Sequence, residues 1–170
     1  VGESTTEPVT ETDPPAETTG EAVDPDLHIV LDGASEYVGI RPESAEDSEI
    51  EAIRSLKSLL REKYGVELAL DTDGNRKPGT DPEYQILIGR TDEPESASAI
   101  AYIDSLGAGK VSFVIEAHEK RLVIVASNVS MYEAAIKNLE ENFMNDTGMT
   151  VPEGFRYTAE AETVNPAIHI

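Results

Sequence analysis

The chain has 170 residues, 39% of them hydrophobic, and its 34 Asp and Glu against 13 Lys and Arg give a formal net charge of −21. This size fits one folded domain with room for a tail. The negative charge repels phosphate backbones and argues against nucleic acid as a partner. No apolar run is long enough to cross a membrane, and the lack of cysteine excludes disulfides and thiolate metal sites.

Residues 1–26 differ in composition from the rest of the chain. They contain eight Asp or Glu, six Thr and four Pro but no Lys or Arg. With so little apolar surface to offset chain entropy, the segment is predicted to be a disordered, acidic tether. Such tracts are typical of the region after the lipid-modified cysteine of bacterial surface lipoproteins, and a generic interdomain linker is the alternative. We therefore expect an extracellular or cell-surface bacterial protein, and the lipoprotein interpretation adds a lipid anchor at its N-terminus.

The folded domain is expected over residues 27–160. It begins with an apolar, β-branched strand at Leu27–Leu31, and a second short strand is expected at 37–40. Ser44 and Asp47 then offer a cap for an amphipathic helix that runs to about residue 64 and ends where Gly65 can adopt a left-handed conformation.

A buried strand is the clearest local feature of the middle of the chain. A strand at 66–70 and a polar loop at 71–82 lead to the apolar run at 84–88, which predicts a strand buried on both faces. Gly89 permits a tight exit from it. A helix follows at 94–106, with an N-cap box predicted from Asp92 and Glu95.

Two strands at 111–117 and 121–126 are predicted to be antiparallel neighbours joined by a short turn at 118–120. Ser127 and Asn128 can cap a third helix that runs to about residue 145, with an apolar face that points inward. The predicted order is ββαββαββα. The fold class is therefore α+β, an α/β sandwich in which about three helices lie mainly on one face of a mixed sheet.

The end of the chain is predicted to be less regular. Residues 149–155 are predicted to form a loop because they contain Pro and Gly. Residues 155–161 are predicted to form an edge strand or a polar exit. The apolar residues within 161–170 are interpreted as an exit segment toward a further domain.

Candidate metal ligands are scattered. His28, His118 and His169 lack the i, i+4 spacing of a helical zinc site. The run 71–75 places oxygen ligands at alternating positions, as a calcium loop does, but Arg76 stands where the EF-hand glycine belongs. A polar turn is the preferred interpretation, and no metal or cofactor is expected.

No catalytic arrangement stands out either. Acidic residues are abundant, but nothing singles out a facing pair with separated pKa values, as glycoside cleavage needs. Thr91, Ser127 and Ser130 have capping explanations and lack a nucleophile elbow. We expect no catalytic residue in this chain. A dedicated sugar-binding role is weakened by the absence of Trp, although Tyr37, Tyr102 and Tyr157 are candidates for exposed stacking platforms.

Residues 27–157 resemble the non-catalytic N-terminal domain that precedes the barrel in bacterial β-N-acetylhexosaminidases, α-glucuronidases and related glycoside hydrolases. The likeness is carried by Lys-Tyr-Gly-Val-Glu-Leu at 63–68, Ile-Leu-Ile-Gly-Arg-Thr-Asp-Glu-Pro at 86–94, the strand Arg121–Ala126 and the helix over 132–143. The chain departs from the family at 126–130, where the family has a glycine-rich turn. Similar domains occur in surface lipoproteins with other catalytic partners.

The resemblance implies a support role. Domains of that family pack against a catalytic domain and contribute no catalytic residues to it. We therefore expect a non-catalytic accessory domain of a multidomain protein involved in carbohydrate degradation, whose partner is a downstream catalytic domain. The open sheet face or an edge should provide the docking surface, with an apolar patch there or near Ile168. The alternative is a free-standing surface module that binds glycan or protein.

The calcium-loop interpretation generates the first prediction. Because Arg76 and Pro82 occupy positions that an EF-hand gives to glycine and a bidentate glutamate, millimolar calcium should leave the melting temperature unchanged. Calorimetry with and without EDTA checks this. A calcium-dependent increase that Asp71→Asn abolishes would contradict it.

Overall fold

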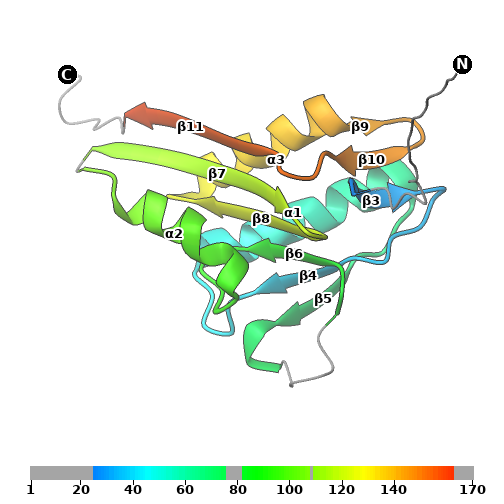
Figure 1. The fold of residues 1–170 in the computed structure, drawn as a ribbon, viewed down its shortest axis with the longest axis horizontal. Helices are drawn as coiled ribbons and strands as arrows, with labels where there is room; N and C mark the ends of the chain where they lie inside the picture. The colour runs from blue at the N-terminus through cyan, green and yellow to red at the C-terminus, as the bar shows by residue number, and fades with distance from the viewer. Residues whose placement is uncertain (1–24, 76–81, 108, 163–170) are drawn as a thin grey trace, which may run out of the picture.

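The computed structural model describes residues 25–75, 82–107 and 109–162 (Figure 1). The tether predicted for 1–26 therefore lies almost entirely outside the described residues, and so does most of the exit segment, including Ile168. Among the described residues, no helix is both long and apolar enough to cross a membrane.

Six strands form one mixed sheet in the order β11-β7-β8-β6-β4-β5. Strands β8, β6, β4 and β5 are parallel, whereas β7 is antiparallel to β8 and β11 is antiparallel to β7. The strands are β4 (Val38–Arg41), β5 (Ala69–Thr72), β6 (Gln85–Ile88), β7 (Lys110–His118), β8 (Arg121–Ala126) and β11 (Arg156–Glu162).

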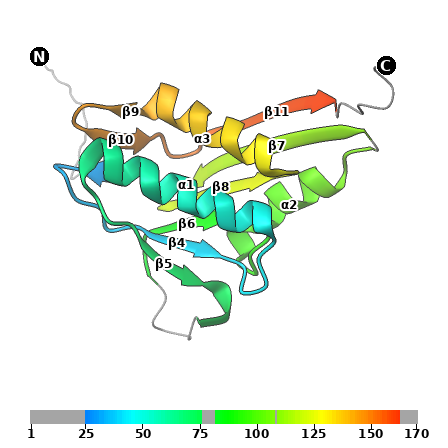
Figure 2. The same ribbon diagram turned by 180° about the vertical axis from the view of Figure 1, so that it is seen from behind.

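Helices cover both faces of this sheet. Helices α1 (Asp47–Tyr64) and α3 (Val129–Phe143) pack on one face, while the short α2 (Ala97–Asp104) lies on the other (Figures 1 and 2). Two 3₁₀ turns, η2 (Asp73–Asn75) and η3 (Pro94–Ser96), complete the helical segments. The α+β class is confirmed. The prediction that one sheet face is open is wrong in part, because α2 covers part of that face.

The buried strand β6 lies between the two cores. All four of its residues are buried, as the apolar run predicts. Ile86 and Ile88 belong to the large core under α1 and α3, whereas Leu87 belongs to the smaller core under α2. Alternation along a strand with a layer on each face explains why the sequence shows a continuous apolar run.

A second, antiparallel sheet has the order β3-β10-β9 and comprises β3 (Leu27–Leu31), β10 (Gly148–Val151) and β9 (Met144–Asn145). The loop predicted for 149–155 is therefore wrong at its start. Met149 and Val151 are fully buried in the large core, so burial overrides the turn-forming Pro and Gly that follow. The Tyr64 hydroxyl ties this sheet to the end of α1, since it lies 2.9 Å from the carbonyl oxygen of Gly148.

Most other predicted elements are present with shifted ends. The strand predicted at 66–70 is found at Ala69–Thr72, and the predicted third helix ends at Phe143. Helix α1 begins after Glu46 rather than Ser44, and Gly65 has the predicted left-handed conformation (φ 70°). Residues 155–161 do form an edge strand, β11.

Candidate functional site

Ligands of α/β sheets commonly bind at the carboxyl ends of parallel strands. In this protein that end of the sheet is closed by the side chain of Glu49, which lies on the first turn of α1 and is only 4% exposed. Its two carboxylate oxygens accept hydrogen bonds from the backbone N–H groups of Glu46 (2.8 Å) and Arg90 (2.9 Å). One carboxylate thereby caps the helix and holds the loop that leaves β6.

Gly89 is required for this contact. It has a φ of 93°, and a Cβ at this position would lie 2.4 Å from a Glu49 carboxylate oxygen. The next residue, Arg90, extends the link to α2, because its guanidinium donates to Asp104 at 2.6 Å. That hydrogen bond holds the pKa of the Asp104 carboxyl below its usual value.

A second carboxylate closes the neighbouring part of this end. Asp73 accepts hydrogen bonds from the backbone N–H groups of Glu43 (2.9 Å) and Asp92 (3.0 Å). The oxygens that the sequence offered as calcium ligands thus include two that already bind backbone groups. No group of three or more potential ligands is found in the part of the chain that the structure describes.

The predicted N-cap box of Asp92 and Glu95 is not formed. Glu93 is the residue that precedes η3, and no side-chain cap hydrogen bond is made there. Instead, the Thr91 hydroxyl accepts from the N–H of Glu93 (3.3 Å) and lies 2.8 Å from the hydroxyl of Ser96. Arg90 and Thr91 of the Ile-Gly-Arg-Thr-Asp motif therefore have structural explanations.

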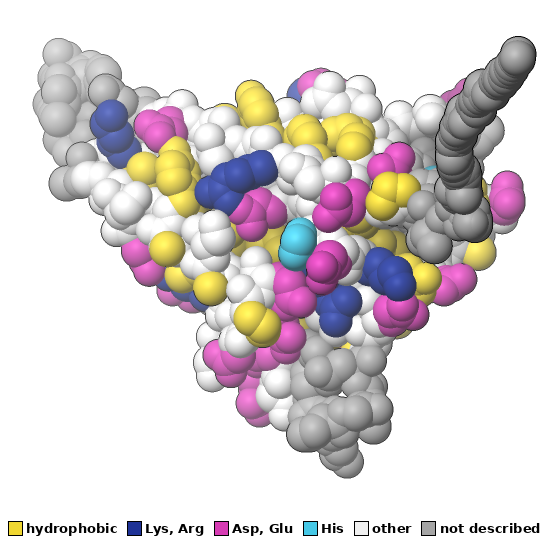
Figure 3. All heavy atoms as spheres, viewed as in Figure 1, with side chains coloured by type: hydrophobic (Ala, Val, Ile, Leu, Met, Phe, Trp, Pro, Cys, Tyr) yellow, Lys and Arg dark blue, Asp and Glu magenta, His cyan; other side chains and the backbone are white. Residues whose placement is uncertain are grey.

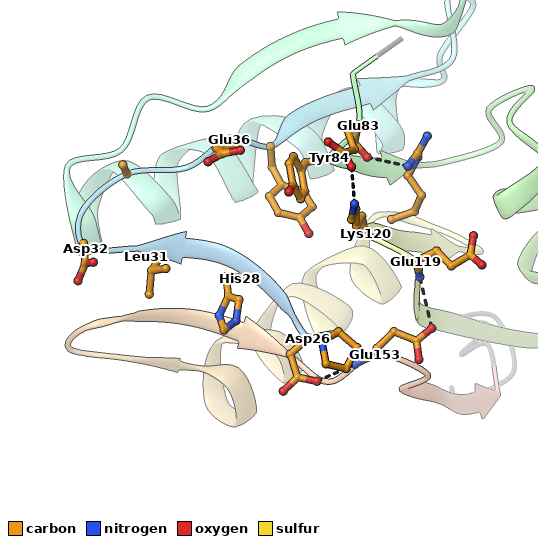
Figure 4. Close-up of a pocket in the computed structure, with 14 residues that line it drawn as sticks. Asp26, His28, Leu31, Asp32, Glu36, Glu83, Tyr84, Glu119, Lys120 and Glu153 are labelled. Atoms are coloured by element: carbon orange, nitrogen blue, oxygen red, sulfur yellow. Dashed lines mark hydrogen bonds and ion pairs between the residues drawn. The ribbon is translucent and has the colours of Figure 1, made fainter. Parts of the chain in front are cut away.

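The opposite end of the sheet is hollowed. A cleft of about 820 Å³ lies where parallel strands β4, β6 and β8 begin, between these strand ends and β3 of the small sheet (Figure 4). Six acidic and two basic residues line it, together with His28, Leu31 and two tyrosines; the charged ones are Asp26, Asp32, Glu36, Glu83, Glu119, Lys120, Arg121 and Glu153.

Aromatic and basic groups form one wall of the cleft. The rings of Tyr37 and Tyr84 are in contact, with centroids 5.3 Å apart. The Lys120 ammonium group lies 5.6 Å from the Tyr84 ring centroid and is paired with the Glu83 carboxylate. In Figure 4 this wall faces His28 and Leu31 across the cleft.

The Tyr37 hydroxyl is buried without a partner. Tyr37 is 3% exposed, and its hydroxyl oxygen has no hydrogen bond although the residue lines the cleft. Burial, with a smaller contribution from Tyr84, raises the pKa of this hydroxyl well above its ordinary value, so it stays protonated at neutral pH. It can therefore donate or accept a hydrogen bond there but cannot act as a base.

Backbone conformation also marks the cleft. Among the described residues, the non-glycine positions with positive φ are Asp32 (54°), Glu119 (48°) and Lys120 (72°), and all three line the cleft. Glu119 and Lys120 form the predicted tight turn between β7 and β8, a turn that ordinarily favours Asn and Gly. Such unfavourable conformations of bulky residues tend to cluster at functional sites.

The histidines lie partly at this cleft. His28 lines it and bonds the Thr150 hydroxyl at 3.0 Å. His118 lies at its edge, 3.5 Å from a carboxylate oxygen of Glu153. In Figure 3 acidic side chains gather near the β7–β8 hairpin on the same face. His169 lies outside the described residues.

Of the candidate aromatic platforms, Tyr37 is buried and therefore offers no exposed ring. Tyr157 is 42% exposed on β11, and the hydroxyl of the half-buried Tyr102 bonds Glu160. Ser127 does not cap α3 but bonds Ser112, while Asn128 accepts from the N–H of Met131 as predicted.

Sequence reasoning missed the cleft. Its residues come from β3 and the segments on either side of it, the residues just before β6, the β7–β8 turn with the start of β8, and the loop after β10, and no motif links these places. No protein-family model matches the chain, and no curated protein matches it.

The role of Gly89 yields a stability prediction. Gly89→Ala should lower the free energy of unfolding by about 3 kcal/mol, of which roughly 1 is left-handed strain and about 2 the disturbed hydrogen bonding of a buried carboxylate. Gly65→Ala is the matched control. Gly65 has a φ of 70° but nothing within 4 Å of a new Cβ, so only the strain of about 1 kcal/mol applies. Urea unfolding measures both, and equal losses would refute the Glu49 contact.

The two buried tyrosines should respond differently to loss of their hydroxyls. Tyr37→Phe removes an unpaired buried oxygen and should leave stability unchanged or raise it. Tyr132 is equally buried, but its hydroxyl is hydrogen-bonded to the backbone of Ala126, so Tyr132→Phe should cost about 1 kcal/mol. Urea unfolding of both variants at pH 7 tests the contrast, and a Tyr37→Phe loss as large as that of Tyr132→Phe would contradict it.

The same tyrosines predict alkaline sensitivity. Burial raises the pKa of both hydroxyls, so the folded protein keeps these protons at a pH where the unfolded chain releases them. Stability should be complete below about pH 10, the ordinary tyrosine pKa, and should fall as pH rises above it. Tyr37→Phe should flatten this decline, and a decline as steep as that of the wild type would count against the burial effect.

Proposed function

We propose that this chain is a non-catalytic accessory domain of a secreted or lipid-anchored bacterial multidomain protein that degrades carbohydrate. In this proposal the domain packs against a neighbouring catalytic domain and supports it.

The observation that carries the proposal is the closed carboxyl end of the parallel strands. Glu49 and Asp73 bind backbone N–H groups of the loops there, which leaves their carboxylates committed to structure. An α/β sheet that performs chemistry usually keeps this end open for its substrate. The resemblance of residues 27–157 to the support domain of glycoside hydrolases favours the same role, and the mixed sheet with flanking helices is the kind of fold that the resemblance implies.

The cleft suits a docking surface better than a sheet face does. The sheet face beside α2 is polar near its edge, where Arg156 pairs with Glu116 and Tyr102 bonds Glu160. By contrast, Leu31, at 53% exposed, is the most exposed of the large apolar side chains on the described residues, and it lines the cleft. An exposed Leu beside polar groups is the composition of a modest inter-domain contact.

The second candidate function is a free-standing surface module that binds glycan or protein. The cleft favours it, because a concave site with a partly exposed tyrosine and convergent polar groups suits a ligand. The two candidates differ in what the isolated chain should bind.

The test begins with the reading frame that contains residues 1–170. Any domain encoded beside them is expressed alone and joined to this chain. If the chain supports it, the neighbour should melt about 2–4 °C or more higher in the joined protein, because even about 1 kcal/mol of docking energy shifts the melting temperature by that amount. The isolated chain should hydrolyse no aryl glycoside and bind nothing on a glycan array. The proposal fails if no domain is encoded beside the chain or the neighbour is unaffected, and glycan binding would then favour the module.

A further inference from the structure

We propose that the cleft between β3 and the starts of β4, β6 and β8 binds a lysine or arginine side chain presented by the neighbouring domain. This inference rests on the proposed accessory function and names the chemistry of its partner.

The lining of the cleft carries a net negative charge. Six carboxylates and two basic groups line it, a formal charge of −4 with His28 uncharged. Both basic groups already have acceptors within the domain, although the buried Arg121 Nε makes no hydrogen bond. Lys120 pairs with the Glu83 carboxylate, and the Arg121 guanidinium donates to the Glu83 carbonyl oxygen at 2.6 Å. A concave acidic surface with its internal cations so engaged attracts a further cation.

Lys120 already shows how a cation can be held here. Its ammonium group lies 5.6 Å from the Tyr84 ring centroid, within the range of a cation–π contact, and pairs with Glu83. The backbone at Lys120 takes an unfavourable left-handed conformation. Lys120 thus occupies one position that suits an ammonium group, and it competes with an incoming cation for the same ring and carboxylate.

The buried Tyr37 hydroxyl is the independent observation that points to a ligand. It lacks any hydrogen-bond partner, although Tyr37 is 97% buried and lines the cleft. A phenolic oxygen accepts a hydrogen bond from an ammonium or guanidinium N–H, and an unpaired buried oxygen gains more from such a donor than a solvated one does. Leu31 and Ala34, also in the lining, offer apolar surface for the aliphatic stem of a basic side chain.

Other ligand classes fit less well. A phosphate would be repelled by the carboxylates. A metal would need a ligand cluster, and the described residues contain none. A sugar would need an open aromatic face, but Tyr37 is buried and Lys120 lies over the Tyr84 ring. The basic side chain is the class that uses the charge and the buried hydroxyl together, and it gains the Tyr84 ring only by displacing Lys120.

Three small peptides provide a direct probe. Acetyl-Gly-Lys-Gly-amide, its arginine counterpart and its norleucine counterpart are titrated into the ¹⁵N-labelled chain, and amide shifts are followed by NMR. The lysine or arginine peptide should shift the amides of Glu36, Tyr84 and Lys120 together, and the norleucine peptide, which has a similar aliphatic chain but no charge, should not. Binding should weaken severalfold when salt is raised from about 20 to 300 mM.

Variants separate the cleft from the general acidity of the protein. Glu36→Gln should weaken peptide binding about two- to fivefold, and Tyr37→Phe about two- to tenfold. Lys120→Met should instead strengthen it, because it removes the competing ammonium group. The matched control is Glu62→Gln, which makes the same charge change in the shallow groove between α1 and α3 and should leave binding unchanged. The melting temperature of each variant verifies that it is folded.

Several results would overturn the inference. If Glu36→Gln and Glu62→Gln weaken peptide binding equally, the peptide is attracted only to the overall charge of the protein. Amide shifts spread over the whole surface would lead to the same conclusion. Weaker peptide binding by the Lys120→Met variant would contradict the proposed competition between Lys120 and the incoming cation. If cleft variants bind like wild type while the neighbouring domain is still stabilised, the accessory function stands and this inference fails. If the basic peptides bind in the cleft and no neighbour is stabilised, the accessory function fails instead.

Discussion

The buried carboxylate of Glu49 is the constraint on which the arrangement of the domain depends. It reaches from the first turn of α1 to the loop after β6, where it accepts the Arg90 N–H at 2.9 Å. A buried carboxylate is tolerated only while its oxygens are hydrogen-bonded, so the helix and the central strand must keep their relative position. Arg90 also links this loop to α2, because its guanidinium donates a hydrogen bond to Asp104. Only glycine fits at position 89, because a Cβ there would lie 2.4 Å from a carboxylate oxygen of Glu49.

This constraint divides the sheet into two ends with different tasks. At the carboxyl end of the parallel strands, Glu49 and Asp73 bind backbone N–H groups, and a ligand that used either carboxylate would have to displace it from the groups that it satisfies. The amino end is concave, acidic and lined by residues with unfavourable backbone conformations, Asp32, Glu119 and Lys120. Such conformations persist only where the surrounding structure holds them in place. We therefore assign a structural role to the hydrogen-bonded end and propose the concave end as the one that binds.

The local elements were predictable from the sequence and the long-range contacts were not. The apolar period of α1, the buried run of β6 and the β7–β8 turn depend on neighbours in the chain, and each was predicted close to its place. Strand β10 was missed because only its pairing with β3, more than a hundred residues away, buries Met149. The cleft was missed for the same reason. Tyr37 was only a candidate for exposure, and the folded arrangement shows that it is buried and that its hydroxyl has no partner.

The most direct test compares backbone amide resonances of the domain alone with those of the same domain joined to any neighbouring domain that its reading frame encodes. If the cleft is the docking surface, the largest changes should fall on cleft residues such as Glu36, Tyr84 and Lys120. Amides at the closed end, those of Arg90 and Asp92, should keep their resonance positions. Changes concentrated at Arg90 and Asp92, with the cleft unaffected, would contradict the division of the sheet into a structural end and a binding end.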